Sequence, residues 1–253
     1  MKIQYCSDLH MEFDDNKRLM DSLPLDVAGD ILVIAGDSGY LNDPSLTNLK
    51  FWEWASRNYR QVLLVAGNHE FYNNGDITAY GDSWQLELLP NVTYYHNKAV
   101  RIDNIDFILT TLWSQIPKGQ EGIIQDSMND YYHILYNNHS VTPHHINEEF
   151  QKNINFVKKA VKDSSAEKIV VVTHHLPTFD ALLGRRKDNE TNPAYATELS
   201  NYISGSRISA WIYGHSHFGT DLMIGNTHLV SNPLGYVFCG QHIGFSKSAI
   251  IEV

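Results

Sequence analysis

The chain has 253 residues, of which 43% are hydrophobic and 19% are charged, and its formal net charge is −10 at pH 7. These values are typical of a globular chain with a large core, and the negative charge argues against a broad nucleic-acid surface. No apolar run approaches the roughly 20 residues that span a bilayer, and no basic and apolar leader begins the sequence. We therefore expect a cytoplasmic protein with no membrane contact. Cys6 and Cys239 lie in apolar, strand-like stretches, which predicts buried thiols rather than a disulfide.

The first predicted strand covers residues 2–7 and runs into Asp8-Leu9-His10. Side chains at i and i+2 of a strand share one face, so Asp8 and His10 can bind one divalent cation while Leu9 faces the core. Such a triplet is weak evidence alone, and its weight depends on further ligands at later strand ends.

Four more apolar stretches end abruptly in polar turns, which predicts strands over residues 31–35, 62–66, 169–173 and 208–213. The turns that follow are Gly36-Asp37, Gly67-Asn68-His69-Glu70, His174-His175 and Gly214-His215-Ser216-His217. Nearly continuous apolar strands indicate a sheet that is covered on both faces. Helical patterns such as residues 45–57 lie between them, and in βαβ units ligand sites lie beyond the carboxyl ends of the strands.

The second half of the chain adds shorter, alternating strands, and Gly225-Asn226 is a hairpin signal. These strands are predicted over residues 92–95, 105–112, 221–224, 228–231 and 248–253. Together the pieces predict an α/β fold of two mixed sheets packed face to face, with helices outside. We find no linker or repeat, so we expect residues 1–253 to form a single domain.

Residues 113–162 depart from this alternation and contain polar, helix-like stretches at 123–135 and 143–161. Thr142-Pro143 fits a capped helix start with proline at the first position. We interpret the segment as a helical, cap-like insertion near the site, either a lid or a layer packed on the sandwich edge. Its aromatic residues could stack on a base or aryl group, but at helical spacing packing is favoured; they are Tyr131, Tyr132, His133, Tyr136 and His139.

The strand ends together supply seven candidate metal ligands of oxygen or imidazole type. They are Asp8, His10, Asp37, Asn68, His174, His215 and His217. Any one turn alone is more often an ordinary turn, but a ligand at every strand end suits two divalent ions about 3.5–4 Å apart. Asp37 is placed to bridge them, and the adjacent glycines, Gly36, Gly67 and Gly214, permit close approach of the backbone.

These ordered motifs, from Asp8-x-His10 to Gly214-His215-Ser216-His217, resemble those of the calcineurin-like metallophosphoesterase superfamily. The resemblance implies a four-layer αββα sandwich and a dinuclear centre of Mn, Fe, Zn or similar ions. By position, the first ion would be held by Asp8, His10, Asp37 and His217, and the second by Asp37, Asn68, His174 and His215. His69 would assist the leaving group, which makes His69, Asp37 and Asn68 the catalytic set. His175 is then a neighbour of the ligand, although a swap with His174 stays open.

The expected reaction is hydrolysis of a phosphate monoester or diester by in-line attack of a metal-bridging hydroxide. Phosphoprotein phosphatases of this superfamily follow Gly-Asp with an Asp and an Arg, and the sequence Gly36-Asp37-Ser38-Gly39-Tyr40-Leu41 has neither. This leaves the residue that orients His69 open, with Glu70 as an outer support. The basic run Arg185-Arg186-Lys187 could attract an anionic substrate, but a solvated surface is favoured.

A small-molecule phosphoester is therefore the expected substrate. A nuclease is the second hypothesis, and the net charge disfavours it. A non-catalytic protein-binding module on the same scaffold is the third, and the intact ligand set opposes it.

Overall fold

The computed structural model describes residues 1–184 and 188–253, so the basic run Arg185-Arg186-Lys187 lies outside the described residues. Two six-stranded mixed sheets form the centre of the molecule. In spatial order, the first contains β15 (Ile250–Glu252), β1 (Lys2–Cys6), β2 (Ile31–Ala35), β3 (Gln61–Val65), β6 (Val92–His96) and β5 (Trp84–Leu89). The second contains β13 (Thr220–Ile224), β14 (Thr227–Ser231), β12 (Ala210–Ile212), β11 (Lys168–Val172), β8 (Ile105–Leu109) and β7 (Lys98–Ile102).

Both sheets have the same plan: parallel central strands with an antiparallel strand at each edge. In the first sheet β1, β2, β3 and β6 are parallel, and β15 and β5 pair antiparallel at the edges. In the second, β8, β11, β12 and β14 are parallel between β7 and β13. Parallel strands present their carboxyl ends at one edge, so the turns after them gather there.

The apolar strands are buried on both faces, as predicted. Side chains such as Ile3 and Val33 of the first sheet meet Phe107 and Val172 of the second in one core. The opposite faces belong to a larger core, in which Leu32 packs with Trp52 of the helix layer. This double burial accounts for strands without polar interruption.

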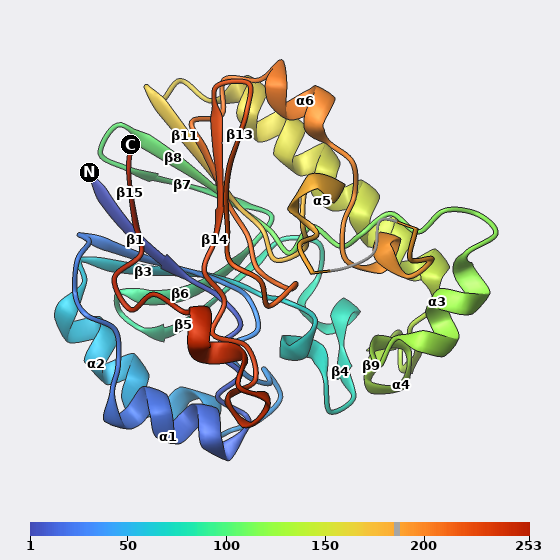
Figure 1. The fold of residues 1–253 in the computed structure, drawn as a ribbon, viewed down its shortest axis with the longest axis horizontal. Coiled ribbons are helices and arrows are strands. Elements are labelled where there is room, and N and C mark those ends of the chain that lie inside the picture. Colours follow the sequence, from blue (N-terminus) through green and yellow to red (C-terminus); the bar gives the residue numbers. More distant parts are fainter. Residues whose placement is uncertain (185–187) are drawn as a thin grey trace.

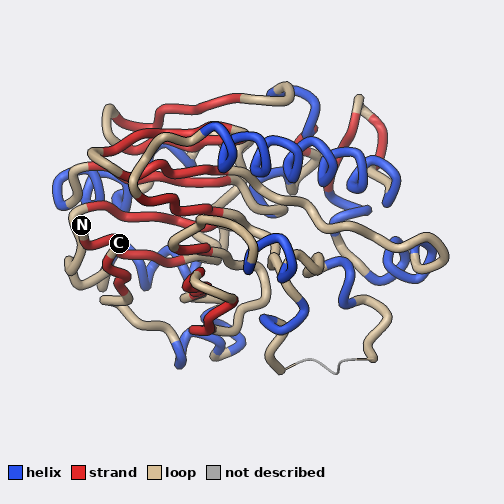
Figure 2. The backbone as a smooth tube through the Cα atoms, turned by 90° about the horizontal axis from the view of Figure 1, so that it is seen from above, coloured by secondary structure: helices blue, strands red, loops and turns tan. Residues whose placement is uncertain are grey.

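Helices cover the outer faces of both sheets and complete the four-layer αββα sandwich (Figure 1, Figure 2). The first sheet carries α1 (Asp14–Ser22) and α2 (Lys50–Asn58), and the second carries α5 (Pro143–Asp163) and α6 (Ser200–Ser204). The predicted helix at 45–57 is divided: η1 (Leu46–Asn48) ends at Leu49, whose extended backbone separates it from α2. The indole of Trp52 donates to the Leu46 carbonyl and fixes this break (2.7 Å).

Residues 113–162 divide into two parts with different positions. Helix α5 packs on β8 as an outer layer, and Thr142 caps it through reciprocal hydrogen bonds with His145. In contrast, α3 (Glu121–Ser127) and α4 (Asp130–His133) lie at the end of the sandwich. There β9 (Ile134–Tyr136) joins β10 (His139–Ser140) and β4 (Gly75–Asp76) in a small third sheet. The two parts of the segment therefore lie in different places, an outer layer on the second sheet and a smaller unit at the end of the sandwich.

Short 3₁₀ helices occupy several connections. They are η2 (His69–Phe71), η3 (Ile77–Tyr80), η4 (Phe179–Ala181), η5 (Asn192–Ala194), η6 (Val237–Cys239) and η7 (Gln241–Gly244). The prediction for Cys239 is wrong: Cys6 is buried, but Cys239 is exposed on η6, where the positive φ of Gly240 ends the apolar stretch in a turn. Among the described residues, no helix combines the length and apolarity that crossing a membrane requires.

Candidate metal centre and active site

All seven predicted ligands converge where the parallel strands of the two sheets end. Backbone hydrogen bonds join the turns within each sheet, from Asp8 N–H to the Gly36 carbonyl (2.9 Å) and from Gly214 N–H to the His174 carbonyl (3.0 Å). A third bond joins the sheets, because His215 N–H donates to the Asp8 carboxylate (2.9 Å). The main chain therefore fixes the position of both sets of ligands.

The first group of ligands contains Asp8, His10, Asp37 and His217, whose inward atoms lie within 4.8 Å of one another. The Nε2 atoms of His10 and His217 are 3.0 Å apart. Asp8 Oδ1 lies 3.4 Å from His217 Nε2, and Asp37 Oδ2 lies 3.7 Å from His10 Nε2. This group could hold one ion.

The second group contains Asp37 again, with His174 and His215. His174 Nε2 lies 3.3 Å from Asp37 Oδ2, 3.1 Å from Asn68 Oδ1 and 3.1 Å from His215 Nδ1. Asn68 presents its oxygen here because its amide nitrogen donates to Asp130 Oδ1 (2.9 Å). Asp37 thus belongs to both groups.

The hydrogen bonds on the outer side of the histidines show that the inward atoms suit cations. His10 Nδ1 donates to Glu12 (3.0 Å), His217 Nδ1 to Gln241 Oε1 (2.7 Å) and His174 Nδ1 to the Ala35 carbonyl (2.8 Å). In a neutral ring this leaves the lone pair on Nε2, facing inward. The close pair of Nε2 atoms would repel each other unless a positive charge lay between them.

The protonation of the site supports this interpretation. Burial lowers the pKa of His215 well below its ordinary value, so its imidazole stays neutral and free to bind a metal. For His174, burial would lower the pKa, but Asp37 raises it to about 9. Asp37 and Asp8 thus give His174 surroundings that favour positive charge.

The ligand turns have unusual backbone conformations. Asp8, His10, Asp37, His215 and His217 all have positive φ angles, between 46° and 72°. Non-glycine residues in this region are strained, and such strain is typical of functional sites. It also corrects the expected geometry, because β1 ends at Cys6 and Asp8 and His10 converge through left-handed turns rather than one strand face.

Gly67 illustrates why glycine stands beside these ligands. A Cβ at this position would lie 2.2 Å from Asp37 Oδ1 and 2.8 Å from the ring of His174. Any side chain here would displace both, so the turn requires glycine for close approach rather than for its φ angle.

His69 lies next to the two groups but outside them. Its Nδ1 donates to Glu12 Oε1 (2.8 Å), the oxygen that also accepts from His10, and its ring stacks on Tyr72 (4.1 Å between centroids). Burial lowers the pKa of His69, but Asp37 and Glu12 raise it to about 9. Glu12 therefore orients His69, a role that the sequence leaves open. The one sequence feature that could indicate Glu12 is its place two residues after His10.

A model of the calcineurin-like phosphoesterase family matches residues 1–219 of the chain. The chain belongs to the calcineurin-like phosphoesterase family. An uncharacterized protein of Acanthamoeba polyphaga mimivirus, L509, is 30% identical over 279 residues, covering 99% of this chain and 96% of that protein. The crystal structure of phosphopantetheinyl hydrolase (PptH) from Mycobacterium tuberculosis has the same fold, with a TM-score of 0.72 and 16% identity, covering 100% of this chain and 95% of that chain.

In this calcineurin-like phosphoesterase, His174 rather than His175 faces the ligand groups. The His175 ring lies behind His215 (4.3 Å between centroids) and beside Trp113. Burial lowers the pKa of His175 to about 3, and the neighbouring His174 adds to this effect. Of the two neighbours, His174 is therefore the one that faces inward.

Glu70 supports the turns from outside, as the sequence suggests. Its carboxylate accepts hydrogen bonds from the backbone N–H groups of Asp37 (2.9 Å), Ser38 (2.7 Å) and Gly67 (2.7 Å), and from the Tyr94 hydroxyl (3.1 Å). One side chain therefore joins the turns after β2 and β3.

We expect Glu70→Gln to lower the free energy of unfolding by about 1–3 kcal/mol, because the amide would point a donor at backbone donors. Urea unfolding followed by tryptophan fluorescence, in the presence of a chelator, measures this change. Glu87→Gln is the matched control, since Glu87 is exposed on β5. Equal stability of the two variants would contradict the supporting role.

A cavity of about 340 Å³ opens over the two ligand groups. Ser127, Met128, Asn129 and Asp130 form one wall, and Tyr195, Tyr236 and Gln241 contribute to the rest. None of the five aromatic residues proposed for stacking lines it: Tyr131 is buried, Tyr132 is exposed, and the His133 ring stacks behind Tyr72. Packing, the favoured interpretation, describes Tyr131, which is buried, and Tyr136, which packs against the core and stacks on His145 (4.3 Å between centroids).

The sequence missed the contribution of residues 233–245, here called the C-terminal loop. Gln241 holds His217, and the Tyr236 hydroxyl lies 3.3 Å from His69 Nε2. Asn16, fully buried on α1, fixes the loop by donating to the Leu9 and Gly235 carbonyls and accepting from Val237 N–H.

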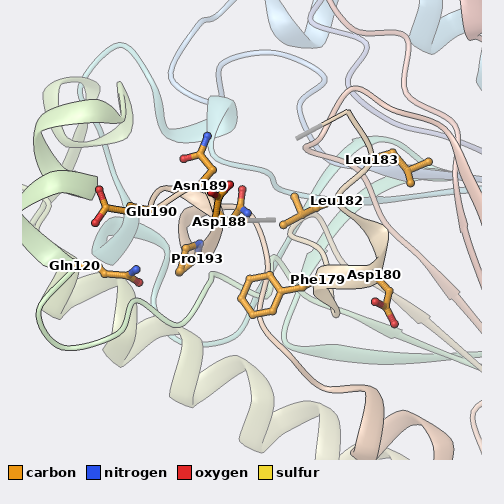
Figure 3. A pocket seen from close by; sticks show the side chains of 10 residues that line it. Gln120, Phe179, Asp180, Leu182, Leu183, Asp188, Asn189, Glu190 and Pro193 are labelled. Carbon is orange, nitrogen blue, oxygen red and sulfur yellow. The ribbon is translucent and has the colours of Figure 1, made fainter. Parts of the chain in front are cut away.

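A larger cavity, of about 530 Å³, lies elsewhere and contains none of the predicted site residues. Phe179, Leu182 and Pro193 give it an apolar side, and Asp188 and Glu190 an acidic one (Figure 3). The ligand groups open into the smaller cavity, which identifies that one as the candidate active site.

Proposed function

We propose that the protein is a dinuclear metal-dependent hydrolase of small phosphate monoesters or diesters. The observation that carries the proposal is the pair of inward-facing ligand groups that share Asp37, with His69 beside them on the same cavity. Asp8, His10, Asp37 and His217 would hold one ion, and Asp37, Asn68, His174 and His215 the other. Manganese is the metal that we would test first, and the cytoplasm is the proposed location.

Two divalent cations would supply charge neutralisation for the phosphoryl oxygens and a low pKa for a shared water, which permits in-line attack at neutral pH. The chain's own residues would position the substrate and handle the leaving group. Because Glu12 accepts from His69 Nδ1, the other nitrogen, Nε2, faces the cavity. From there it would donate a proton to the departing oxygen.

The size of the cavity supports a small substrate, and Asn129 and Asp130 narrow it from the side of α3 and α4. We infer that this part of residues 113–162 acts as a rim around the substrate, within a single domain formed by residues 1–253. PptH, whose fold is similar, is named for hydrolysis of a phosphopantetheinyl group. A compact phosphoester is therefore favoured over a protein substrate, and the missing Asp and Arg after Asp37 point the same way.

Parallel assays with an aryl monoester, an aryl diester and single-stranded DNA, each with manganese, test the proposal. We expect hydrolysis of at least one aryl ester and little cleavage of DNA. Cleavage of DNA alone would favour the nuclease. Inactivity on all three by protein shown to contain its metal would favour the protein-binding module.

A further inference from the structure

Tyr236 lines the active-site cavity, and two further aromatic side chains pack against it. The ring of Tyr236 stacks on Phe238 (5.4 Å between centroids, 19°) and meets Phe13 edge-on (5.5 Å, 88°). Phe13 and Phe238 also contact each other (5.7 Å). We call Phe13, Tyr236 and Phe238 the aromatic platform.

The aromatic platform begins at the atom that would face the leaving group. The Tyr236 hydroxyl lies 3.3 Å from His69 Nε2, and its ring packs on the rings of His10 and His217 (4.6 Å each). A substituent on an oxygen that is bound by His69 would therefore lie within reach of the Tyr236 ring.

The platform extends outward to Phe238, whose ring stays largely exposed despite its contacts with Tyr236 and Phe13. Phe238 is 59% exposed, so its ring gains little from burial in the protein. The loop that carries it is nevertheless held in place by the hydrogen bonds of Asn16 and by Gln241 Oε1, which accepts from Tyr236 N–H (2.7 Å). Because the loop is already ordered in the free protein, it loses little conformational entropy when a ligand binds to it.

We propose that the aromatic platform is a subsite for an aromatic ring carried by the leaving group of the substrate. The inference rests on the proposed function and narrows it to aryl-type esters. Offset stacking or edge contact with such a ring contributes about 0.5–1.5 kcal/mol beyond burial of its area.

Binding of non-hydrolysable phosphonates tests the subsite independently of turnover. Titration calorimetry on the manganese-loaded protein compares phenylphosphonate with methylphosphonate. We expect the wild type to prefer phenylphosphonate by about three- to tenfold or more, from the stacking contribution. Phe238→Ala should remove most of this preference while leaving methylphosphonate affinity unchanged, and Phe238→Tyr should retain it.

Phe179→Ala is the matched control, because Phe179 is an exposed phenylalanine that lines the other cavity (Figure 3). It should keep the wild-type ratio. The subsite is overturned if the wild type does not prefer phenylphosphonate, including the case in which it binds neither compound, or if Phe238→Ala weakens both compounds equally. A wild type that prefers phenylphosphonate but hydrolyses no aryl ester would instead reject the proposed function and retain the subsite.

Discussion

His69→Ala is expected to lower turnover about a hundredfold or more while the protein keeps its metal ions. The expected loss is that of a general acid, which contributes about 10²–10⁴ to the rate. Metal binding should persist because the His69 side chain lies outside both ligand groups, and its hydrogen bond to Asp37 Oδ1 (2.9 Å) is made by the backbone N–H, which alanine keeps. Steady-state rates and metal analysis on the same preparation measure both properties.

The leaving group should decide how large this loss is. An ester of an acidic, nitro-substituted phenol needs little protonation, so its hydrolysis should suffer less than that of a phenyl ester. Glu12→Gln should also slow hydrolysis of the phenyl ester more than that of the nitrophenyl ester. Its loss of rate should be smaller than that of His69→Ala, because it only weakens the orientation of His69. His144→Ala, an exposed histidine on α5, serves as the control. If the His69→Ala protein lost its ions and regained a normal rate when they were resupplied, the assignment of His69 as the general acid would be wrong.

Asp37→Ala is expected to have the larger effect on metal content. Its carboxylate belongs to both ligand groups, so removing it should reduce the bound metal from two ions per chain to one or none. Loss of several kcal/mol of transition-state stabilisation corresponds to a fall in turnover of about a thousandfold or more. Metal stoichiometry by elemental analysis, with the hydrolysis rate, measures this outcome.

Glu53→Ala is the matched control, since Glu53 is an exposed acid that pairs with Arg57 on the surface (3.3 Å). Such pairs contribute about 0–1 kcal/mol, so stability, metal content and rate should change little. An Asp37→Ala protein that still bound two ions would show that Asp37 does not bridge them.

The sandwich and the ligand turns could be predicted from the sequence because their signals are local. Uninterrupted apolar strands such as residues 31–35 require burial on both faces. Each of these strands ends at a polar turn that contains the candidate ligand residues. Parallel strands then place those turns at one edge without any knowledge of side-chain packing. The position of Asp37 at the turn after β2 is therefore enough to predict a carboxylate that belongs to both groups of candidate ligands.

The supporting residues were missed because their partners are distant in sequence. Asp130 meets Asn68 across 62 positions, and Tyr236 meets His69 across 167. Contacts of this kind depend on how loops from different sheets fold over one another, which no periodicity records. The prediction of a buried Cys239 thiol is wrong for a related reason. Its apolar neighbours predict a strand, but the chain turns at Gly240 and the thiol is exposed.

Crystals grown with manganese, with the ions located by anomalous scattering, test the central claim most directly. We predict two ions on opposite sides of Asp37, one among Asp8, His10 and His217 and the other among Asn68, His174 and His215. A site that stays vacant at saturating manganese, or ions bound away from Asp37, would contradict it.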